Sequence, residues 1–519
     1  MAHSETEEFT GLRSYLWPIH MHELRKLIPM LCIFFLICFN YSILKNLKDA
    51  IVVNARGSGA EVIPFLKVWA MLPFAVFLTY ALSKLGRIMS QEKVFYCVVI
   101  FFLTYFLLFI TLLYPNRDWI HPHATADYIT KLTPDGMAGL IAVARNWSFS
   151  IFYALSELWA AIVLSVLFWG FANNITKVCE AKRFYSVFGI GANLAAVAGA
   201  QAALYLTFEE SVPFLPSAHD AWEQTIIALC SVVIVIGFAI IAIYRWLHVN
   251  VVYPEELSTP SSPSSKKKNQ GSLSESFRLL LSSKYLICLA VLVLGYNLCI
   301  NLVEVLWKDQ LRQLYPTGAQ YNIYMNKLTS VMGVISTFTA VFISGNAIRR
   351  LGWTFTAMLT PVIMLITTLG FFGFLLFGPS MAVLFPVLDG LSPLVVVVFF
   401  GAAHNAFSKA AKYTVFDNTK EMAFIPLDPE QKLHGKAAID GVISRMGKSG
   451  GSLIHQIFLF VFASFTMSAP YIAIITITSI VCWILAVRVL SKEFKALSSA
   501  PSTSNVNNSE KNSEVLATS

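Results

Sequence analysis

The sequence predicts an all-α membrane protein with twelve transmembrane helices, arranged as two consecutive sets of six, and with both termini in the cytoplasm. The composition indicates a membrane protein, because 56% of the 519 residues are hydrophobic and only 13% are charged. The mean hydropathy is +0.64. Apolar stretches of bilayer-spanning length recur along the chain, and basic residues concentrate in alternate connections between them. These features are typical of a polytopic membrane protein.

Twelve apolar stretches have about the length that crosses a bilayer as an α-helix, roughly 17 to 25 residues. The first set lies near 27–49, 62–83, 94–114, 146–172, 184–206 and 224–247. The second set lies near 285–307, 326–348, 353–377, 392–413, 436–463 and 469–490. Polar residues interrupt the tenth and eleventh stretches, which is also expected of helices that line a polar cavity.

The basic residues between the stretches predict the orientation. With the N-terminus inside, the inside connections carry Lys84, Arg87 and Lys93; Lys177, Lys182 and Arg183; Lys266, Lys267 and Lys268; Arg349 and Arg350; and Lys420, Lys432 and Lys436. One outside connection is acidic, and two others, near 378–391 and 464–468, contain no Lys or Arg. This is the positive-inside pattern, and it places both termini in the cytoplasm.

The chain divides into five predicted segments. They are a cytoplasmic N-terminus at 1–26, an N-terminal six-helix half at 27–248, a basic cytoplasmic linker at 249–284, a C-terminal six-helix half at 285–491 and a disordered cytoplasmic tail at 492–519. The linker contains STPSSPSSKKKNQGS, a flexible and basic composition. Two halves in the same orientation are the plan of major-facilitator-type transporters, which hold substrate between the halves near the middle of the membrane.

Several classes of protein are disfavoured. The eight cysteines show no paired short spacing, so neither a disulfide framework nor a zinc site is expected. The net charge of +8 is dispersed between apolar stretches and does not indicate nucleic-acid binding. The string Gly447-Lys448-Ser449 does not fit a P-loop, because Gly441 precedes it by one residue too many and no strand lies before it. No metal, cofactor or catalytic group is predicted, which leaves a membrane-embedded phosphate-processing enzyme as a remote alternative.

Four charged residues lie in or at the ends of apolar stretches: Lys48, Glu157, Glu304 and Lys448. A charge at bilayer depth costs roughly 2.5 to 3.5 kcal/mol on insertion scales. Such residues are retained when they pair with one another, face water or hold a charged ligand. All three interpretations place them around an internal polar site.

Two pairs of basic residues are candidates for binding phosphate. Lys45 and Lys48 are three residues apart in the first stretch, and Arg445 and Lys448 repeat this spacing in the eleventh. Residues at this spacing share a helix face, so two cations on one face favour an anion between them. The alternative interpretation, that Lys45 and Lys48 are anchors at the membrane surface, stays open.

Glu157 and Glu304 are candidates for coupling or gating rather than for binding phosphate. Glu157 and Glu304 are expected to pair with Lys48 or Lys448 when the site is empty, to bind a proton or to act as gates. A static salt bridge remains an alternative, and Lys308 is well placed to pair with Glu304 as its neighbour four residues away. Asn297 and Asn301 are candidates for contacting a base or ribose, whereas Lys409 is interpreted as part of a cytoplasmic helix end.

The chain resembles the ATP/ADP translocase family of plastids and obligate intracellular bacteria, and within it the chlamydia type. The resemblance covers about 20–490 and rests on long strings, among them LIPMLCIFFLICFNYSIL, GSGAEVIPFLKVW, SELWAAIVLSVLFWGFANNIT, INLVEVLWK, AFSKAAKYTVFDNTKEMAFIPLD, GKAAID and GKSGGS. It implies a major-facilitator-like fold and a nucleotide substrate. It also implies that the residues tied to transport are Lys48, Glu157, Glu304 and Lys448.

The expected function is transport of nucleotides across a bacterial inner membrane by alternating access, with ATP/ADP-type exchange as the first expectation. The substrates would be nucleoside tri- and diphosphates, and the protein would work as a monomer in the bilayer. The family commonly has Arg-Asp-Thr-Lys-Asp in the first span, where this chain has Lys45-Asn46-Leu47-Lys48-Asp49. This departure keeps open the alternative of proton-coupled import of one or several nucleoside triphosphates (GTP, UTP, CTP or ATP).

Overall fold

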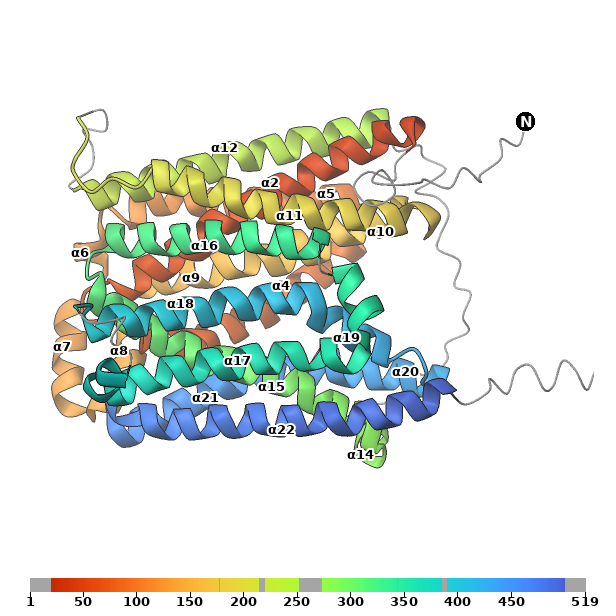
Figure 1. The fold of residues 1–519 in the computed structure, drawn as a ribbon. Coiled ribbons are helices and arrows are strands. Elements are labelled where there is room, and N and C mark those ends of the chain that lie inside the picture. The colour runs from red at the N-terminus through yellow and green to blue at the C-terminus, as the bar shows by residue number, and fades with distance from the viewer. Residues whose placement is uncertain are drawn as a thin grey trace, which may run out of the picture.

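The structure is a computed structural model, and it describes residues 20–176, 178–213, 220–251, 273–342, 344–384 and 390–499. Every regular element in these ranges is helical. Most of the predicted N-terminal segment, linker and tail lie outside the described residues. The helices run along a common direction as one elongated bundle (Figure 1).

The first half of the chain forms what is called here the N-terminal set of helices. Its elements are η1 Met21–Glu23, α2 Leu24–Val53, α3 Val62–Phe65, η2 Leu66–Ala70, α4 Met71–Ile88, α5 Gln91–Leu108, η3 Phe109–Leu113, α6 Arg117–Ile120, α7 His123–Leu132, η4 Asp135–Met137, α8 Ala138–Arg145, α9 Trp147–Trp159, η5 Ala160–Phe168, α10 Trp169–Ile175, α11 Val178–Tyr205 and α12 Ala221–Asn250.

The second half forms the C-terminal set. Its elements are α14 Leu273–Ser282, α15 Lys284–Leu314, α16 Gly318–Phe342, α17 Ser344–Leu384, α18 Pro393–Ala411, η7 Lys412–Phe416, α19 Asp417–Ala423, α20 Pro429–Lys436, η8 Ala437–Ile443, α21 Ser444–Phe462 and α22 Phe465–Ser499. Helix α17 is broken at Gly352, whose φ of 77° is one that few other residues adopt. Helix α14 lies within the predicted linker 249–284 and packs on α20 and α15.

Ten helical segments of the described chain are long and apolar enough to cross a membrane. They correspond to all the predicted spans except 326–348 and 436–463, which are α16 and η8–α21. Both of these run along the bundle with the others (Figure 1). Their polar residues lower their apolar character: α16 carries Asn322 and Asn326, and α21 carries Arg445 and Lys448. The total of twelve spans therefore stays a prediction.

The two ends of the bundle differ. The short helices α6, α7 and α8 lie at one end, called here the α7 end, and α14, α19 and α20 lie at the other, called the α20 end (Figure 1). Helix α2 begins and α22 finishes at the α20 end, so the first and last long helices start and stop on the same side. That side is the cytoplasmic one in the predicted orientation.

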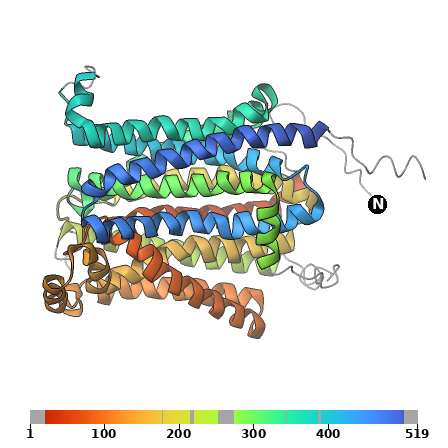
Figure 2. The same cartoon turned by 90° about the horizontal axis from the view of Figure 1, so that it is seen from below.

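The two sets lie side by side (Figure 2), and the contacts between them repeat. The fifth long helix of the N-terminal set, α11, packs against the second long helix of the C-terminal set, α16. In the same way, α21 of the C-terminal set packs against α3 and η2, which open the second long helix of the N-terminal set. This reciprocal arrangement fits a pseudo-repeat of six and six helices.

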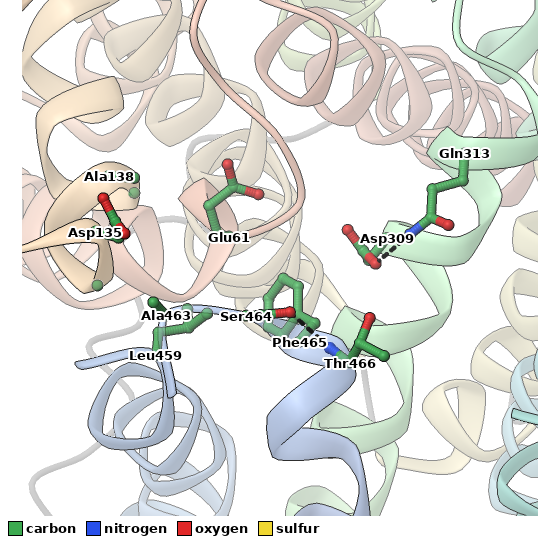
Figure 3. A pocket seen from close by; sticks show the side chains of 12 residues that line it. Glu61, Asp135, Ala138, Asp309, Gln313, Leu459, Ala463, Ser464, Phe465 and Thr466 are labelled. Atoms are coloured by element: carbon green, nitrogen blue, oxygen red, sulfur yellow. Dashed lines mark hydrogen bonds between the residues drawn. The ribbon is translucent and has the colours of Figure 1, made fainter. Parts of the chain in front are cut away.

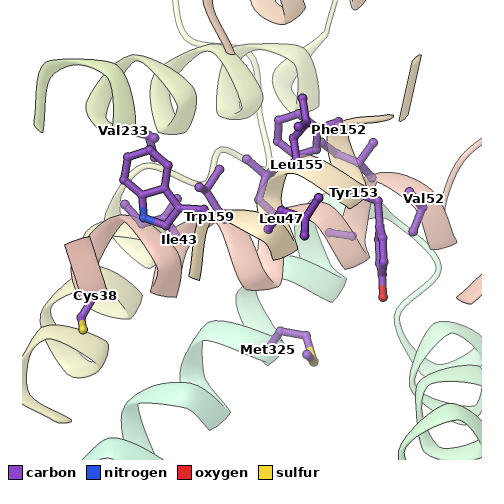
Figure 4. Close-up of a cluster of buried hydrophobic side chains, with 14 of the residues drawn as sticks. Cys38, Ile43, Leu47, Val52, Phe152, Tyr153, Leu155, Trp159, Val233 and Met325 are labelled. Carbon is purple, nitrogen blue, oxygen red and sulfur yellow. The ribbon is translucent and has the colours of Figure 1, made fainter. Parts of the chain in front are cut away.

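An aromatic and aliphatic core holds α2 in the middle of the N-terminal set. Trp159 of α9 is fully buried, and its indole Nε1 donates a hydrogen bond to the Ile37 carbonyl of α2 at 3.1 Å. Leu47 and Val233 lie in the same cluster, where side chains from α2, α9 and α12 interlock (Figure 4). Close packing of this kind fixes the rotation of α2, and with it the direction of its polar side chains.

Candidate functional site

Helix α2 carries Lys45, Asn46, Lys48 and Asp49 within little more than one turn. Helices α9, α11, α12 and α16 surround α2, so these polar side chains must find partners inside the bundle. Asn46, Lys48 and Asp49 are at most 3% exposed, whereas Lys45 is only half-buried. The first span therefore contributes a deeply buried charge pair to the bundle interior.

Lys48 has three partners in the N-terminal set. Its Nζ donates to Asp49 Oδ1 at 3.0 Å and lies 3.4 Å from Glu157 Oε2 of α9. It also lies 3.8 Å from the ring centroid of Tyr153, one turn before Glu157 on the same helix. Two carboxylates and an aromatic face together make a buried ammonium tolerable. The expected pairing of Lys48 with Glu157 is present in this conformation.

The C-terminal set contributes a matching group. Lys308 of α15 is 3% exposed, and its Nζ donates to Asp49 Oδ2 at 2.8 Å. The same Nζ lies 3.4 Å from Glu304 Oε1, one turn earlier in α15. Glu304 also lies 3.7 Å from Lys409 Nζ of α18. Lys409 therefore belongs to the interior charges rather than to a helix end at the membrane surface.

Together these contacts form one continuous series of alternating charges, called here the charge chain. It contains three lysines and three carboxylates and runs from one set of helices to the other: Glu157, Lys48, Asp49, Lys308, Glu304 and Lys409. Its inner members are nearly fully buried, whereas the side chains of Glu157 and Glu304 are 35% and 19% exposed. Ligands can therefore reach the glutamates while Asp49 stays covered.

Two further lysines lie beside the charge chain without an ion-pair partner among the described residues, Lys45 and Lys67. The largest electrostatic influence on Lys45 is the like charge of Lys409 from the opposite set. Lys67 lies within electrostatic reach of Glu304 and Lys308. Lysines without an ion-pair partner provide a place for a negatively charged ligand.

The second predicted cation pair lies apart from Lys48. Arg445 and Lys448 are exposed residues of α21, and they form no ion pair among the residues described. Lys448 lies within electrostatic reach of Lys412, Glu157 and Glu304. Lys308, rather than Lys448, is the lysine of the C-terminal set that shares Asp49 with Lys48.

Asn297 and Asn301 lie where α15 meets α21, and each is 5% exposed. Asn297 Nδ2 donates to the Val293 carbonyl at 2.8 Å and to Ser444 Oγ at 3.4 Å. A methyl group added at Gly447 would lie 2.7 Å from Asn297 Cβ, so the glycine allows the two helices to approach closely. In this conformation both amides present little surface to a base or ribose.

Asn46, one of the residues that departs from the family pattern, joins the two sets through neutral hydrogen bonds. Its Nδ2 donates to Asn326 Oδ1 at 2.8 Å and to Thr329 Oγ1 at 3.0 Å, both on α16. An aspartate cannot donate either bond. The hydrogen bonds to α16 therefore require the amide group of Asn46.

Segments of π-helix lie next to the charged residues. The π-helical η2 contains Lys67, η5 begins shortly after Glu157, η7 begins at Lys412 and η8 ends just before Arg445. Each such segment inserts an extra residue into the helical repeat and so redirects the side chains that follow. Segments of π-helix occur frequently at functional sites.

A separate pocket of about 260 Å³ lies near the α7 end. It is lined by Glu61 and Asp135 from the N-terminal set and by Asp309, Gln313 and Thr466 from the C-terminal set (Figure 3). Three carboxylates repel phosphate groups, so this pocket does not suit the phosphates of a nucleotide. The lysine-rich region around the charge chain is the better candidate for an anionic substrate.

Sequence reasoning missed four members of this region: Asp49, Lys67, Lys308 and Lys409. Lys67 and Lys409 lie inside apolar stretches, so the insertion cost that identified Lys48 applies to them as well. In the sequence, Asp49 stands out only as a member of the family motif, and Lys308 only as a local neighbour of Glu304. Their joint contact depends on how α2 and α15 pack, which no spacing within one helix reveals.

Among the described residues, no group of three or more His, Cys, Asp or Glu side chains is arranged to hold a metal ion. The arrangement offers charge complementarity for an anion held between two sets of helices.

Comparison with known proteins identifies the family. The sequence model of the TLC ATP/ADP transporter family matches residues 2–494. The chain is 43% identical over 505 residues to ADP,ATP carrier protein 1 of Chlamydia pneumoniae, an alignment that covers 96% of this chain and 97% of that protein. It is 42% identical to the chloroplastic ADP,ATP carrier protein 1 of Arabidopsis thaliana, over 93% of this chain and 76% of that protein.

A solved structure shares the fold. The crystal structure of a bacterial homologue of the iron transporter ferroportin, in an inward-facing state, aligns with a TM-score of 0.53 over 91% of this chain and 100% of that chain. At 11% identity this likeness concerns the fold alone. The architecture is thus that of a major-facilitator-like transporter, as predicted. The match along nearly the whole sequence and the close relatives show that the chain belongs to the TLC ATP/ADP transporter family.

Proposed function

We propose that this protein exchanges ATP for ADP across a bacterial inner membrane by alternating access, as a monomer with both termini in the cytoplasm. The family and its relatives, which are named as ADP,ATP carriers from Chlamydia and from chloroplasts, support the nucleotide substrate. The observation that carries the proposal is the series of charges between the two helix sets, flanked by lysines without ion-pair partners.

The phosphates would be held by cations from both sets. Lys45 and Lys48 act from the N-terminal set, and Arg445 and Lys448 act from the C-terminal set, with Lys67 and Lys409 as additional neighbours. Arginine offers a planar fork for phosphate oxygens, and each lysine offers a mobile point charge. Since Lys45, Lys67 and Lys448 lack ion-pair partners among the described residues, they are free to bind before any existing pair breaks.

The glutamates would couple binding to movement. Glu157 shares Lys48 with Asp49, and Glu304 shares Lys308 with Asp49. Glu304 also contacts Lys409, and the distances from the glutamates to these lysines are 3.4 to 3.7 Å. Phosphate oxygens that approach Lys48 or Lys409 compete with these carboxylates and so weaken existing ion pairs. Because Glu157, Glu304 and Lys409 are the partly exposed members of the charge chain, this competition starts at the side that a nucleotide can reach.

Reconstituted vesicles test the proposal. Uptake of labelled ATP should require ADP inside the vesicles and should be insensitive to a protonophore. Uptake into vesicles without internal nucleotide that a protonophore abolishes would contradict exchange. It would instead support proton-coupled import, the alternative that the departure from the family pattern at Lys45 and Asn46 keeps open.

A competition experiment addresses the nucleobase. Unlabelled ATP and ADP should suppress uptake of labelled ATP more strongly than GTP, UTP or CTP do. Asn297 and Asn301 are the proposed contacts to the base or ribose, and they would have to leave some of their present packing to make them. Equal suppression by all triphosphates would assign recognition to the phosphates alone.

A further inference from the structure

Asp49 lies at the centre of the charge chain and has no role in the function proposed so far. Each of its oxygens has its own lysine: Lys48 Nζ lies 3.0 Å from Oδ1, and Lys308 Nζ lies 2.8 Å from Oδ2. Asp49 is 2% exposed, and each lysine is 3% exposed. One carboxylate therefore holds a lysine of each helix set in the same buried place.

The ion pair between Asp49 and Lys308 joins the two sets of helices. Of the ion pairs formed between two residues of the described chain, this is the one that links the N-terminal set to the C-terminal set. The remaining contacts of Lys48 and Lys308 stay within their own sets, through Glu157 and Glu304.

The charges of the two sets are unequal on either side of this contact. In the charge chain, the N-terminal set contributes Lys48 against Asp49 and Glu157, and the C-terminal set contributes Lys308 and Lys409 against Glu304. Within the charge chain, the N-terminal set thus has one negative charge in excess, which Lys45 and Lys67 lie beside, and the C-terminal set has one positive charge in excess. Moving the sets apart in an empty carrier leaves Lys308 and Lys409 with Glu304 as the carboxylate between them, and this excess positive charge in a largely buried place is unfavourable.

The position of the contact shows which movement it opposes. Asp49 lies in the last turns of α2, which ends at Val53, and Lys308 lies in the last turns of α15, which ends at Leu314. Both helices finish at the α7 end (Figure 1). Opening the bundle at the α7 end by separating the two sets requires this ion pair to break.

We propose that the Asp49–Lys308 pair makes exchange obligatory, with Asp49 as a positioning residue that acts through Lys308. In the empty carrier the pair holds the sets together at the α7 end. A bound nucleotide supplies negative charge to the lysines of the C-terminal set, so that the sets separate without leaving Lys308 uncompensated. This inference rests on the proposed exchange function. It adds the reason why a carrier without bound nucleotide does not change from one open state to the other.

Efflux from loaded vesicles tests this inference. Vesicles containing the full-length protein are loaded with labelled ATP and diluted into buffer with or without ADP. Wild-type efflux should depend on external ADP. In Asp49→Asn the link is lost while Lys48 keeps Glu157 and Lys308 keeps Glu304, so efflux without ADP should rise at least about tenfold relative to the exchange rate of the same variant, within the usual range of coupling energies.

Three further variants make the result specific. Asp49→Glu keeps the charge but changes the packing, and its efflux should still depend on external ADP. If altered packing alone caused the efflux without ADP, Asp49→Glu would show that efflux as well. Lys308→Gln removes the other partner and should show the same efflux without ADP, and it serves if Asp49→Asn does not fold. Asp118→Asn changes an exposed aspartate of α6 in the same way and should behave as wild type.

The outcomes separate this inference from the proposed function. If wild-type protein shows no ADP-dependent efflux, the exchange function itself is wrong. If wild type exchanges and both Asp49→Asn and Lys308→Gln still require external ADP, exchange stands and the role of the ion pair is overturned. Folded variants that bind ATP but release none in either buffer would likewise contradict it.

Discussion

Single lysines in apolar helices carry most of the functional information in this chain. Lys48 and Lys67 both lie in long apolar segments, yet their surroundings differ: Lys48 has two carboxylates and the Tyr153 ring within 4 Å, whereas Lys67 has no ion pair among the described residues. A buried lysine with partners has its charge balanced in the empty protein, and one without partners is available to a ligand. The same residue type therefore serves two purposes within one site.

Replacing Lys67 by alanine should weaken ATP binding by roughly three- to thirtyfold, the range expected when one charge-assisted contact to phosphate is lost. Equilibrium binding of labelled ATP to purified protein measures this. Lys84→Ala, at an exposed position of the continuing helix α4, is the matched control and should bind as wild type. Unchanged affinity in Lys67→Ala would remove this residue from the site.

Three of the six members of the charge chain, Lys48, Glu157 and Glu304, were candidates from the sequence alone. The cost of burying charge identified Lys48, Glu157, Glu304 and Lys448, and Lys48 does lie beside Glu157. The same argument applied evenly would have included Lys67 and Lys409. Asp49 and Lys308 were not predictable as a pair, because 259 residues separate them and only the packing of α2 against the C-terminal set brings them together.

At the scale of elements, glycines set how closely the helices of the C-terminal set approach. Gly447 of α21 faces Asn297 of α15 and has no room for a side chain, whereas Gly450, three residues later, has open space around it. The structure shows that the approaching group at Gly447 is a neighbouring helix, as is common between membrane helices.

This contrast makes a prediction about stability. Gly447→Ala should lower the free energy of unfolding by about 1 to 3 kcal/mol, because the methyl group overpacks the α15–α21 contact. Gly450→Ala should leave the stability unchanged or raise it by up to about 1 kcal/mol, because alanine is the better helix former. Thermal melts in the same detergent compare the two variants. Equal melting temperatures would show that α21 moves away from α15 without loss.

The helix boundaries show where sequence reasoning works and where it fails at this scale. Long apolar runs such as α2 and α12 are predicted within a few residues of their observed ends. The helices α16 and α21 are less apolar than the other long helices, and some of their polar residues, such as Asn326 and Ser452, contact other helices. Composition measures apolar character, while a helix inside a bundle needs partners for its polar groups.

At the scale of the whole molecule, the reciprocal contacts between the two sets of helices define where they can separate. The pairs α11–α16 and α21–α3 are equivalent under exchange of the two sets. Rocking about such an interface opens one end of the bundle as it closes the other. The charge chain lies between the sets, so its contacts must change as they rock.

The predicted orientation can be tested with cysteine reporters. Trp119 at the α7 end is 88% exposed, and the side chain of Lys284 at the α20 end is 72% exposed. In intact cells a membrane-impermeant maleimide should label Trp119→Cys and should label Lys284→Cys only after permeabilisation. The parent protein with its native cysteines is the control. The reverse pattern would invert the orientation inferred from the basic connections.

The central claim is that cations from both sets of helices bind the phosphates of a nucleotide, and uptake of labelled ATP by intact cells that produce the Lys448→Ala variant tests it most directly. Lys448 has no ion pair among the described residues, so its removal leaves the charge chain intact and the protein should reach the membrane in normal amount. The account predicts uptake no greater than that of cells without the transporter. Uptake equal to that of wild type would contradict it.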